Sequence, residues 1–176
     1  MNEERENLIY ESDDHNFRIH FKYLYRRQFV SVIVLPNEGQ RIGEVLKDFN
    51  FNKIKDYFDS AEKKNVNLKL PKFKIFSQNN LIDTLKTHGV TDIFDRNLSN
   101  FEMMTNHSVY ITHLMQATNV GIDDVDVRKS GKKVKKLKIR PKPIKFHVTR
   151  PFLFLVNYLP RNVVLISAVV TNATAA

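Results

Sequence analysis

The sequence predicts an α+β domain that is rich in strands. Apolar residues alternate with a period of two, or run on without interruption, over residues 17–35 and 146–170, as in strands with one or both faces buried. Between residues 42 and 89, three shorter segments carry apolar residues at three- and four-residue spacings, which favours helices. With 176 residues, 42% hydrophobic residues and 13 Phe, the chain is long and apolar enough for one packed core.

The strand signals are spread along the chain. Residues 17–23 alternate, 29–36 form a β-branched run that stops at Pro36, and 66–76 alternate again. The segment SVYITHLMQATNVGI (108–122) is predicted as a strand, and two further runs flank a turn at Pro160–Asn162. The last pair therefore forms a hairpin in this interpretation.

Three helices are predicted, at about 42–49, at about 54–58 and around Leu85. Asn79 or Asn80 is placed to cap the third helix, and Gly89 is placed to end it, because glycine adopts the left-handed conformation that closes many helices.

The positive charge is confined to one segment. The chain carries a net charge of +9, but residues 128–145 hold ten Lys and Arg and no acid, which leaves the rest at −1. The segment reads either as a solvated loop, as a nuclear import signal, or as a site for a polyanion such as a heparin-like glycosaminoglycan or a nucleic-acid backbone. It contains no aromatic residue for base stacking. The lysines expected to bind a polyanion are Lys132, Lys133, Lys135, Lys136 and Lys138.

Several function classes find no support in the sequence. Cysteine is absent, the six histidines are scattered, and no phosphate loop, dinucleotide fingerprint or nucleophile elbow occurs, so we expect no enzyme activity, metal, cofactor or small-molecule substrate. His113 is expected to be packed in its strand. Residues 152–170 are interrupted by polar residues and should not cross a membrane. The acidic start lacks a secretory signal, which predicts an intracellular protein if Met1 is the true start.

Several blocks, in order, are similar to the C-terminal half of the serpins, a family of serine protease inhibitors. FVSVIVLP, LPKFKI and LIDTLKTHGVTDIFD each resemble a family segment, and FHVTRPFLFLVNYLPRNVVLISAVVTN (146–172) resembles its C-terminal signature. The resemblance implies an incomplete large sheet plus a small barrel-like sheet with a few helices. It places a partial serpin domain at 8–172, a reactive loop at about 123–145, and tails at 1–7 and 173–176. Most of the family is extracellular.

Inhibitory serpins trap a protease when the cleaved reactive loop inserts into the large sheet. The resemblance implies a hinge at Asp124, Val125, Asp126, Val127, Arg128 and Lys129, where the family has small, uncharged residues. An inserted strand would bury Lys129 and Lys133, at a cost of several kcal/mol for each unpaired ammonium. Gln116 and Asn119 also replace a histidine and a phenylalanine of the family pattern.

The position of the scissile bond is also implied by the resemblance. It falls at Arg140, which suits a trypsin-like serine protease, but Pro141 follows and makes this bond a poor substrate. We therefore expect a serpin-family protein that is nominally a serine-type endopeptidase inhibitor but does not inhibit. The alternatives are a polyanion-binding module acting through residues 128–145, and a chain that is inactive alone and aggregates through exposed strand edges.

Overall fold

The chain divides into two compact units. A computed structural model describes residues 2–24, 26–122 and 142–172. Unit 1 comprises residues 1–73 and 122–176, and unit 2 comprises residues 74–121. None of the described helices has both the length and the apolar character that crossing a bilayer requires.

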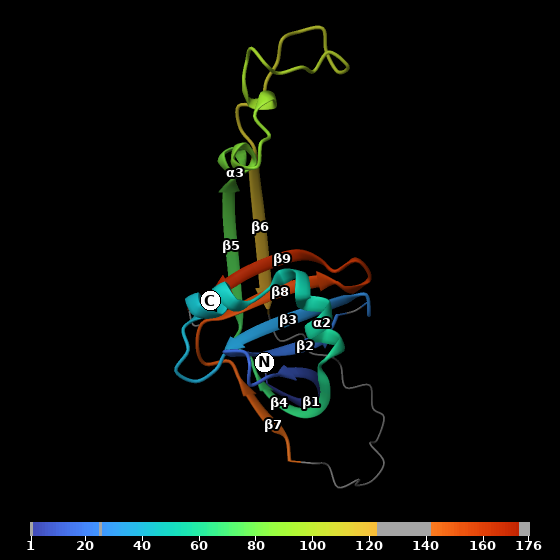
Figure 1. Cartoon of the computed structure of the whole chain (residues 1–176), viewed down its shortest axis with the longest axis vertical. Coiled ribbons are helices and arrows are strands. Elements are labelled where there is room, and N and C mark those ends of the chain that lie inside the picture. The colour runs from blue at the N-terminus through green and yellow to red at the C-terminus, as the bar shows by residue number, and fades with distance from the viewer. Residues whose placement is uncertain (1, 25, 123–141, 173–176) are drawn as a thin grey trace. The chain divides into compact units, whose positions relative to one another are not determined.

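Unit 1 is built on a seven-stranded sheet with the order β7-β4-β1-β2-β3-β8-β9 (Figure 1). Neighbouring strands are antiparallel except β4 and β7, which run parallel. The strands are β1 (Asn2–Glu11), β2 (Phe17–Tyr23), β3 (Phe29–Pro36), β4 (Glu62–Lys69), β7 (Ile144–His147), β8 (Phe152–Tyr158) and β9 (Val163–Val170).

One face of this sheet packs against two short helices, α1 (Ile42–Asp48) and α2 (Ile54–Asp59), joined by the 3-10 turn η1 (Phe51–Lys53). Both helices were predicted from their apolar spacing, and that spacing places Val45, Ile54 and Tyr57 in the core. Alternate residues of the strands complete this cluster: Phe17, Ile19, Phe21, Val30, Val32, Val34, Leu153 and Leu155. The period-two pattern of residues 17–23 is thus explained by burial against the helices.

The opposite face is buried as well around β2. His20 is fully buried there, and the strand register places it between Ile9 of β1 and Ile33 of β3. The ring of Phe146 in β7 lies 5.4 Å from the His20 ring. Burial on both faces explains why residues 32–35 are continuously apolar.

Unit 2 contains a two-stranded ladder of β5 (Phe73–Asn80) and β6 (Met115–Ile122). The first residue of β5 and the last residue of β6 belong to unit 1. The Leu81 amide donates to the Leu114 carbonyl at 2.9 Å, so the end of β5 lies beside the start of β6 and the strands are antiparallel (Figure 1). Between them lie α3 (Ile82–Thr87) and the 3-10 turn η2 (Asp92–Phe94).

The residues predicted to mark the start and the end of α3 lie at its two ends. The Ile82 amide donates to Asn80 Oδ1 at 3.1 Å, and Gly89 has a φ of 86° just beyond the helix. The strand predicted over 108–122 was too long, because only Met115–Ile122 is strand. His113 therefore lies outside any strand and is exposed, contrary to the prediction, and its Nδ1 lies 3.1 Å from the Thr112 hydroxyl.

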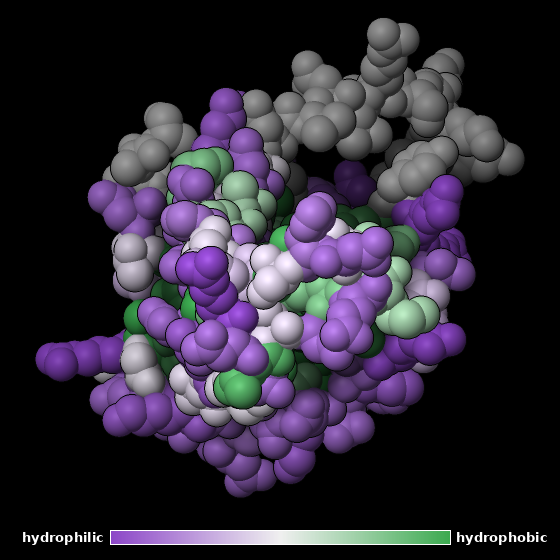
Figure 2. Space-filling model, turned by 90° about the horizontal axis from the view of Figure 1, so that it is seen from above, coloured by the Kyte–Doolittle hydropathy of each residue, from purple (hydrophilic) through white to green (hydrophobic). Residues whose placement is uncertain are grey.

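Unit 2 has little core of its own. Apolar side chains of this unit are exposed at Phe76, Val90, Leu98, Met103, Met104, Val109, Tyr110 and Met115. Figure 2 shows apolar side chains lying between hydrophilic ones on the face that it presents. Of the described residues 74–121, only Val120 is buried.

Two segments differ from the sequence prediction. The sequence predicts a tail over residues 1–7, but residues 2–7 form the first part of β1 and pair with β4 from Asn2↔Lys69 to Asn7↔Lys64. The alternating pattern over 66–76 is divided at Leu70–Lys72 into β4 and β5, since Pro71 cannot donate to a strand ladder.

The final hairpin was predicted correctly. The 3-10 turn η3 (Leu159–Arg161) joins β8 to β9 and ends at Asn162, which has a φ of 49°. The Asn162 amide group donates to the Asn52 carbonyl at 2.9 Å and so ties the turn to η1. Strand β9 forms one edge of the sheet, with Leu165 exposed, and an apolar edge of this kind favours pairing with another chain.

Candidate functional site

The predicted reactive loop connects β6, which ends at Ile122, to β7, which begins at Ile144. Residues 123–141 lie outside the described residues. This range includes every residue predicted for the hinge, the scissile bond and the polyanion site: Asp124, Val125, Asp126, Val127, Arg128, Lys129, Lys132, Lys133, Lys135, Lys136, Lys138, Arg140 and Pro141. The structure does describe β6 and β7, the two strands that flank the loop. Their contacts show how each end of the loop is anchored.

The strand before the loop, β6, is poorly buried. It pairs with β5, and along its eight residues only Val120 is buried. Met115 is 50% exposed, and Phe76 on β5 is 69% exposed. Gln116 and Asn119, which replace a histidine and a phenylalanine of the family pattern, are both exposed. Beyond Met115, the exposed residues of β6 are polar or small, so this strand adds little apolar surface.

The strand after the loop, β7, is firmly held in unit 1. Phe146 is fully buried, and the guanidinium of Arg18 lies over its ring at 4.8 Å. Arg18 also donates to the Lys145 carbonyl at 3.1 Å. Burial lowers the pKa of Arg18, an effect that Glu11 opposes and Arg150 reinforces. These contacts between β2 and β7 fix the position at which the loop re-enters the sheet.

The outer face of β7 carries cations. Lys145 and His147 lie on this face together with Asn67 and Lys69 of β4, because the register pairs Asn67 with Lys145 and Lys69 with His147. His147 Nε2 lies 3.4 Å from Asn67 Oδ1. Desolvation lowers the pKa of His147, and the charges of Lys69, Lys145 and Arg18 lower it further. We call Lys69, Lys145 and His147 the cation row.

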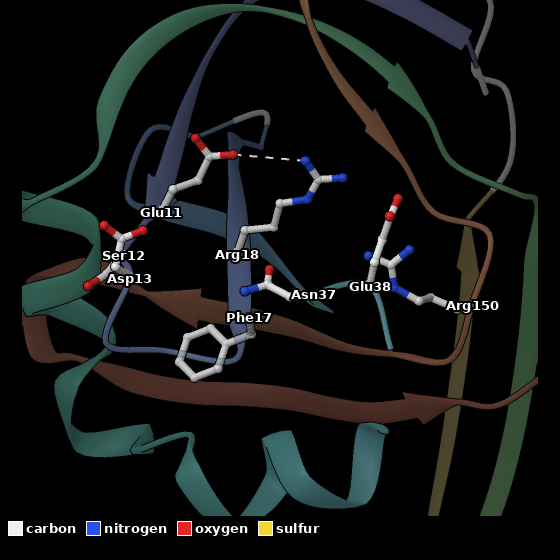
Figure 3. A pocket seen from close by; sticks show the side chains of 8 residues that line it. All are labelled: Glu11, Ser12, Asp13, Phe17, Arg18, Asn37, Glu38 and Arg150. Carbon is white, nitrogen blue, oxygen red and sulfur yellow. Dashed lines mark ion pairs between the residues drawn. The ribbon is translucent and has the colours of Figure 1, made fainter. Parts of the chain in front are cut away.

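A polar cavity of about 520 Å³ lies in unit 1 at the start of β2 (Figure 3). Its lining comes from three separate segments: Glu11, Ser12, Asp13, Phe17, Arg18, Asn37, Glu38 and Arg150. Glu11 points toward Arg18, with 3.8 Å between Oε1 and the nearest guanidinium nitrogen. Arg150 donates through Nε to the Pro36 carbonyl at 2.7 Å, which ties the β7–β8 connection to β3.

This cavity shows no arrangement for chemistry. Its three carboxylates and two guanidiniums leave no excess of positive charge for an anion, and both arginines are already engaged in holding the sheet together. Among residues 2–24, 26–122 and 142–172, no group of three His, Cys, Asp or Glu side chains is placed to hold a metal ion. The cavity was not predicted, because its lining residues lie far apart in the sequence.

Buried His20 was also missed by the sequence analysis. Neither of its ring nitrogens has a hydrogen-bond partner in the described part of the chain. Burial, reinforced by the charge of Lys22, lowers the pKa of His20 from 6.5 to about 4. The alternation of apolar residues in β2 placed His20 on the face that was expected to be polar and exposed. Its burial could therefore not be read from the sequence of β2.

Comparisons with known proteins agree with the resemblance. The sequence model of the family described as "Serpin (serine protease inhibitor)" matches residues 1–173. Human glia-derived nexin is 28% identical over 145 residues, which are 80% of this chain and 36% of the nexin. Serine proteinase inhibitor 1 of myxoma virus is 24% identical over 84% of this chain and 39% of its own length.

Solved structures give the same result for the fold. A serpin from the trematode Schistosoma haematobium superposes with a TM-score of 0.82 and 26% identity, over 98% of this chain and 46% of the serpin. A structure of native protease nexin-1 with heparin has a TM-score of 0.77 at 23% identity and covers 97% of this chain. The chain thus spans less than half the length of each of these relatives.

Proposed function

Because the chain belongs to the serpin family of serine protease inhibitors, we propose that it is a non-inhibitory member, which trypsin-like proteases cleave without being trapped. The segment between β6 and β7 supplies the cleavage sites. Arg140 is followed by Pro141, whose rigid ring and missing N–H disfavour cleavage at that bond. Cleavage at the neighbouring lysines would give scattered products rather than one inserted strand of the correct length.

The polar and small side chains of β6 are the observation that supports this proposal. Trapping in this family draws its energy from insertion of the cleaved loop as a new strand of a sheet. Beside β6, an added strand would gain ladder hydrogen bonds, each worth about 1 kcal/mol net. It would bury little apolar area, since Gln116, Ala117, Thr118, Asn119 and Gly121 of β6 are polar or small residues. Burial of Lys129 and Lys133 would oppose insertion further.

We expect cleavage in the basic segment to leave the thermal stability of the protein almost unchanged. Limited trypsin digestion, with the cut placed within residues 128–145 by mass spectrometry, gives the nicked form for comparison with the intact chain. Since no strand is inserted, the two melting temperatures should differ by less than about 4 °C, equivalent to about 1 kcal/mol for a chain of this size. A rise of more than about 10 °C after cleavage would show that the loop inserts, and would contradict the proposal.

A second candidate function is the binding of a polyanion through the basic segment. The ten Lys and Arg without an intervening acid favour it, and the cation row on β4 and β7 lies where this segment ends. The related protease nexin-1 structure contains heparin. The lysines Lys132, Lys133, Lys135, Lys136 and Lys138 would bind by charge alone, because no aromatic residue interrupts them. Loss of heparin binding when these five lysines become serine distinguishes this candidate from the first.

A further inference from the structure

Strand β7 is a short edge strand. It lies at one end of the strand order, so β4 is its ladder partner among the described strands, over residues 144–147. Further contacts come from β2, where Arg18 donates to the Lys145 carbonyl at 3.1 Å. Arg18 and His20 both lie against the Phe146 ring. A four-residue edge strand of this kind opens at a lower free energy than the whole sheet.

The contact between His20 and Phe146 joins two strands that are not neighbours in the sheet. Strands β4 and β1 lie between β7 and β2 in the strand order, yet the two rings are 5.4 Å apart. Both side chains are fully buried. Ile9 and Ile33 flank His20 within the sheet, so Phe146 is the side chain that covers it from β7. Departure of β7 therefore exposes the imidazole to water.

His20 suits its buried position as the neutral imidazole. Neither ring nitrogen has a hydrogen-bond partner among the residues that the structure describes, so an imidazolium would carry two N–H donors without an acceptor. The charged residues on its face of β2 are Arg18 and Lys22, each two positions away. Glu11 lies beside Arg18 at 3.8 Å, and Glu3 of β1 pairs with Lys22 at 2.5 Å. The neighbours of His20 from β3 and β7 are apolar.

The chain after β7 is fastened separately. The Val148 amide donates to the Lys69 carbonyl at 2.8 Å, and Arg150 donates through Nε to the Pro36 carbonyl at 2.7 Å. These bonds hold the connection to β8, which itself pairs with β3 on one side and β9 on the other. An opening of β7 can therefore end at Val148 and leave the other six strands in place.

We propose that protonation of His20 releases β7 from the sheet, so that the strand after the predicted reactive loop is held at neutral pH and freed by acid. In the closed state, burial and then Lys22 lower the pKa of His20 to about 4, and in the open state it returns to the ordinary 6.5. The closed state thus has its full advantage above pH 6.5 and loses it progressively down to about pH 4. This inference concerns the intact chain alone and does not rest on the proposed function.

Hydrogen exchange of the intact chain, followed by mass spectrometry at pH 7 and pH 5, measures the opening. After correction for intrinsic exchange rates, protection of the amides of residues 144–147 should fall about 20-fold, the ratio that pKa values of 6.5 and about 4 give over this interval. Low urea should leave these β7 rates unchanged, because a local opening exposes little surface, while exchange in β3 and β8 accelerates. Parallel urea dependence in β7 and β8 would mean global unfolding and would overturn the proposal.

Two histidine variants identify the group that responds to pH. His20→Leu should show the same β7 protection at pH 7 and pH 5 within about twofold, because the buried proton acceptor is gone. The matched control His147→Gln removes the titratable ring of β7 itself and should retain a fall of at least about tenfold. Ordinary Asp and Glu titrate near pH 4, below this interval. Loss of the fall in His147→Gln, with the fall retained in His20→Leu, would show that His20 is not the group.

A disulfide between β4 and β7 tests the movement with His20 unchanged, and so stands even if His20→Leu fails to fold. The register pairs Asn67 with Lys145 on strands about 4.8 Å apart, within the reach of a disulfide. The chain has no other cysteine. Oxidised Asn67→Cys/Lys145→Cys should keep its pH 7 protection of β7 at pH 5, and the same protein after reduction should show the 20-fold fall. An acid-dependent loss of protection in the oxidised form would contradict release of β7 from β4.

Discussion

Replacing Phe17 by alanine is expected to lower the free energy of unfolding by about 3 to 5 kcal/mol, the range typical for a fully buried phenylalanine. Phe17 begins β2 and is fully buried. Its ring stacks on His15 at 4.9 Å and meets Phe49 and Tyr57 edge-on at 5.6 and 5.9 Å. Because these rings join the sheet to the loop after α1 and to α2, the cavity left by Phe17→Ala cannot close without moving a helix.

The matched control for this change is Phe76→Ala, which removes the same atoms from a side chain that is 69% exposed. Its effect should stay within about 0.5 kcal/mol. Urea denaturation followed by far-UV circular dichroism measures both variants against the parent. Equal losses for Phe17→Ala and Phe76→Ala would mean that the helix-covered face is not the main core.

The stability of the protein is expected to fall by about 3 kcal/mol between pH 7 and pH 4 through His20 alone. Burial, with Lys22, lowers the pKa of His20 from 6.5 to about 4, so the unfolded chain binds a proton that the folded chain rejects. The loss therefore begins near pH 6.5 and levels off below about pH 4. Urea denaturation across this range measures it.

The variant His20→Leu separates this effect from that of the carboxylates, which both proteins share. It removes two buried nitrogens that have no hydrogen-bond partner among the residues that the structure describes, so its stability at pH 7 should equal or exceed that of the parent. Between pH 6.5 and pH 4, the free energy of unfolding of His20→Leu should fall by about 3 kcal/mol less than that of the parent. His88→Leu makes the same change at an exposed position and should retain the parental fall. Parallel pH curves for His20→Leu and the parent would refute this interpretation of His20.

The elements that the sequence predicted well are those with a strong local signal. The helices around Val45 and Tyr57 follow from their spacing alone, and Asn80 and Gly89 bound α3 through contacts made within a few residues. The first part of β1 was missed, because a charged run becomes a strand only through pairing with a segment sixty residues away. Glu6 forms an ion pair with Lys63 across that pairing, and neither residue signals it alone.

Less of the candidate site was predictable. The cation row arises because β4 and β7 run parallel with Lys69 opposite His147, a register that depends on Phe146 entering the core next to His20. The charges of Lys69 and Lys145 were visible in the sequence, but the register that places them on one face was not. The burial of His20 likewise depends on a strand that lies more than a hundred residues away.

Incubation of the intact chain with trypsin, followed by a denaturing gel, tests the proposed function most directly. The charged hinge and the mainly polar and small residues of β6 predict rapid cleavage within residues 128–145 and no covalent complex. The chain of 20.6 kDa should disappear into fragments while trypsin retains its activity toward a chromogenic substrate. A new band near the summed masses of chain and protease, with loss of trypsin activity, would show that the acyl-enzyme is trapped and that the protein is an inhibitor.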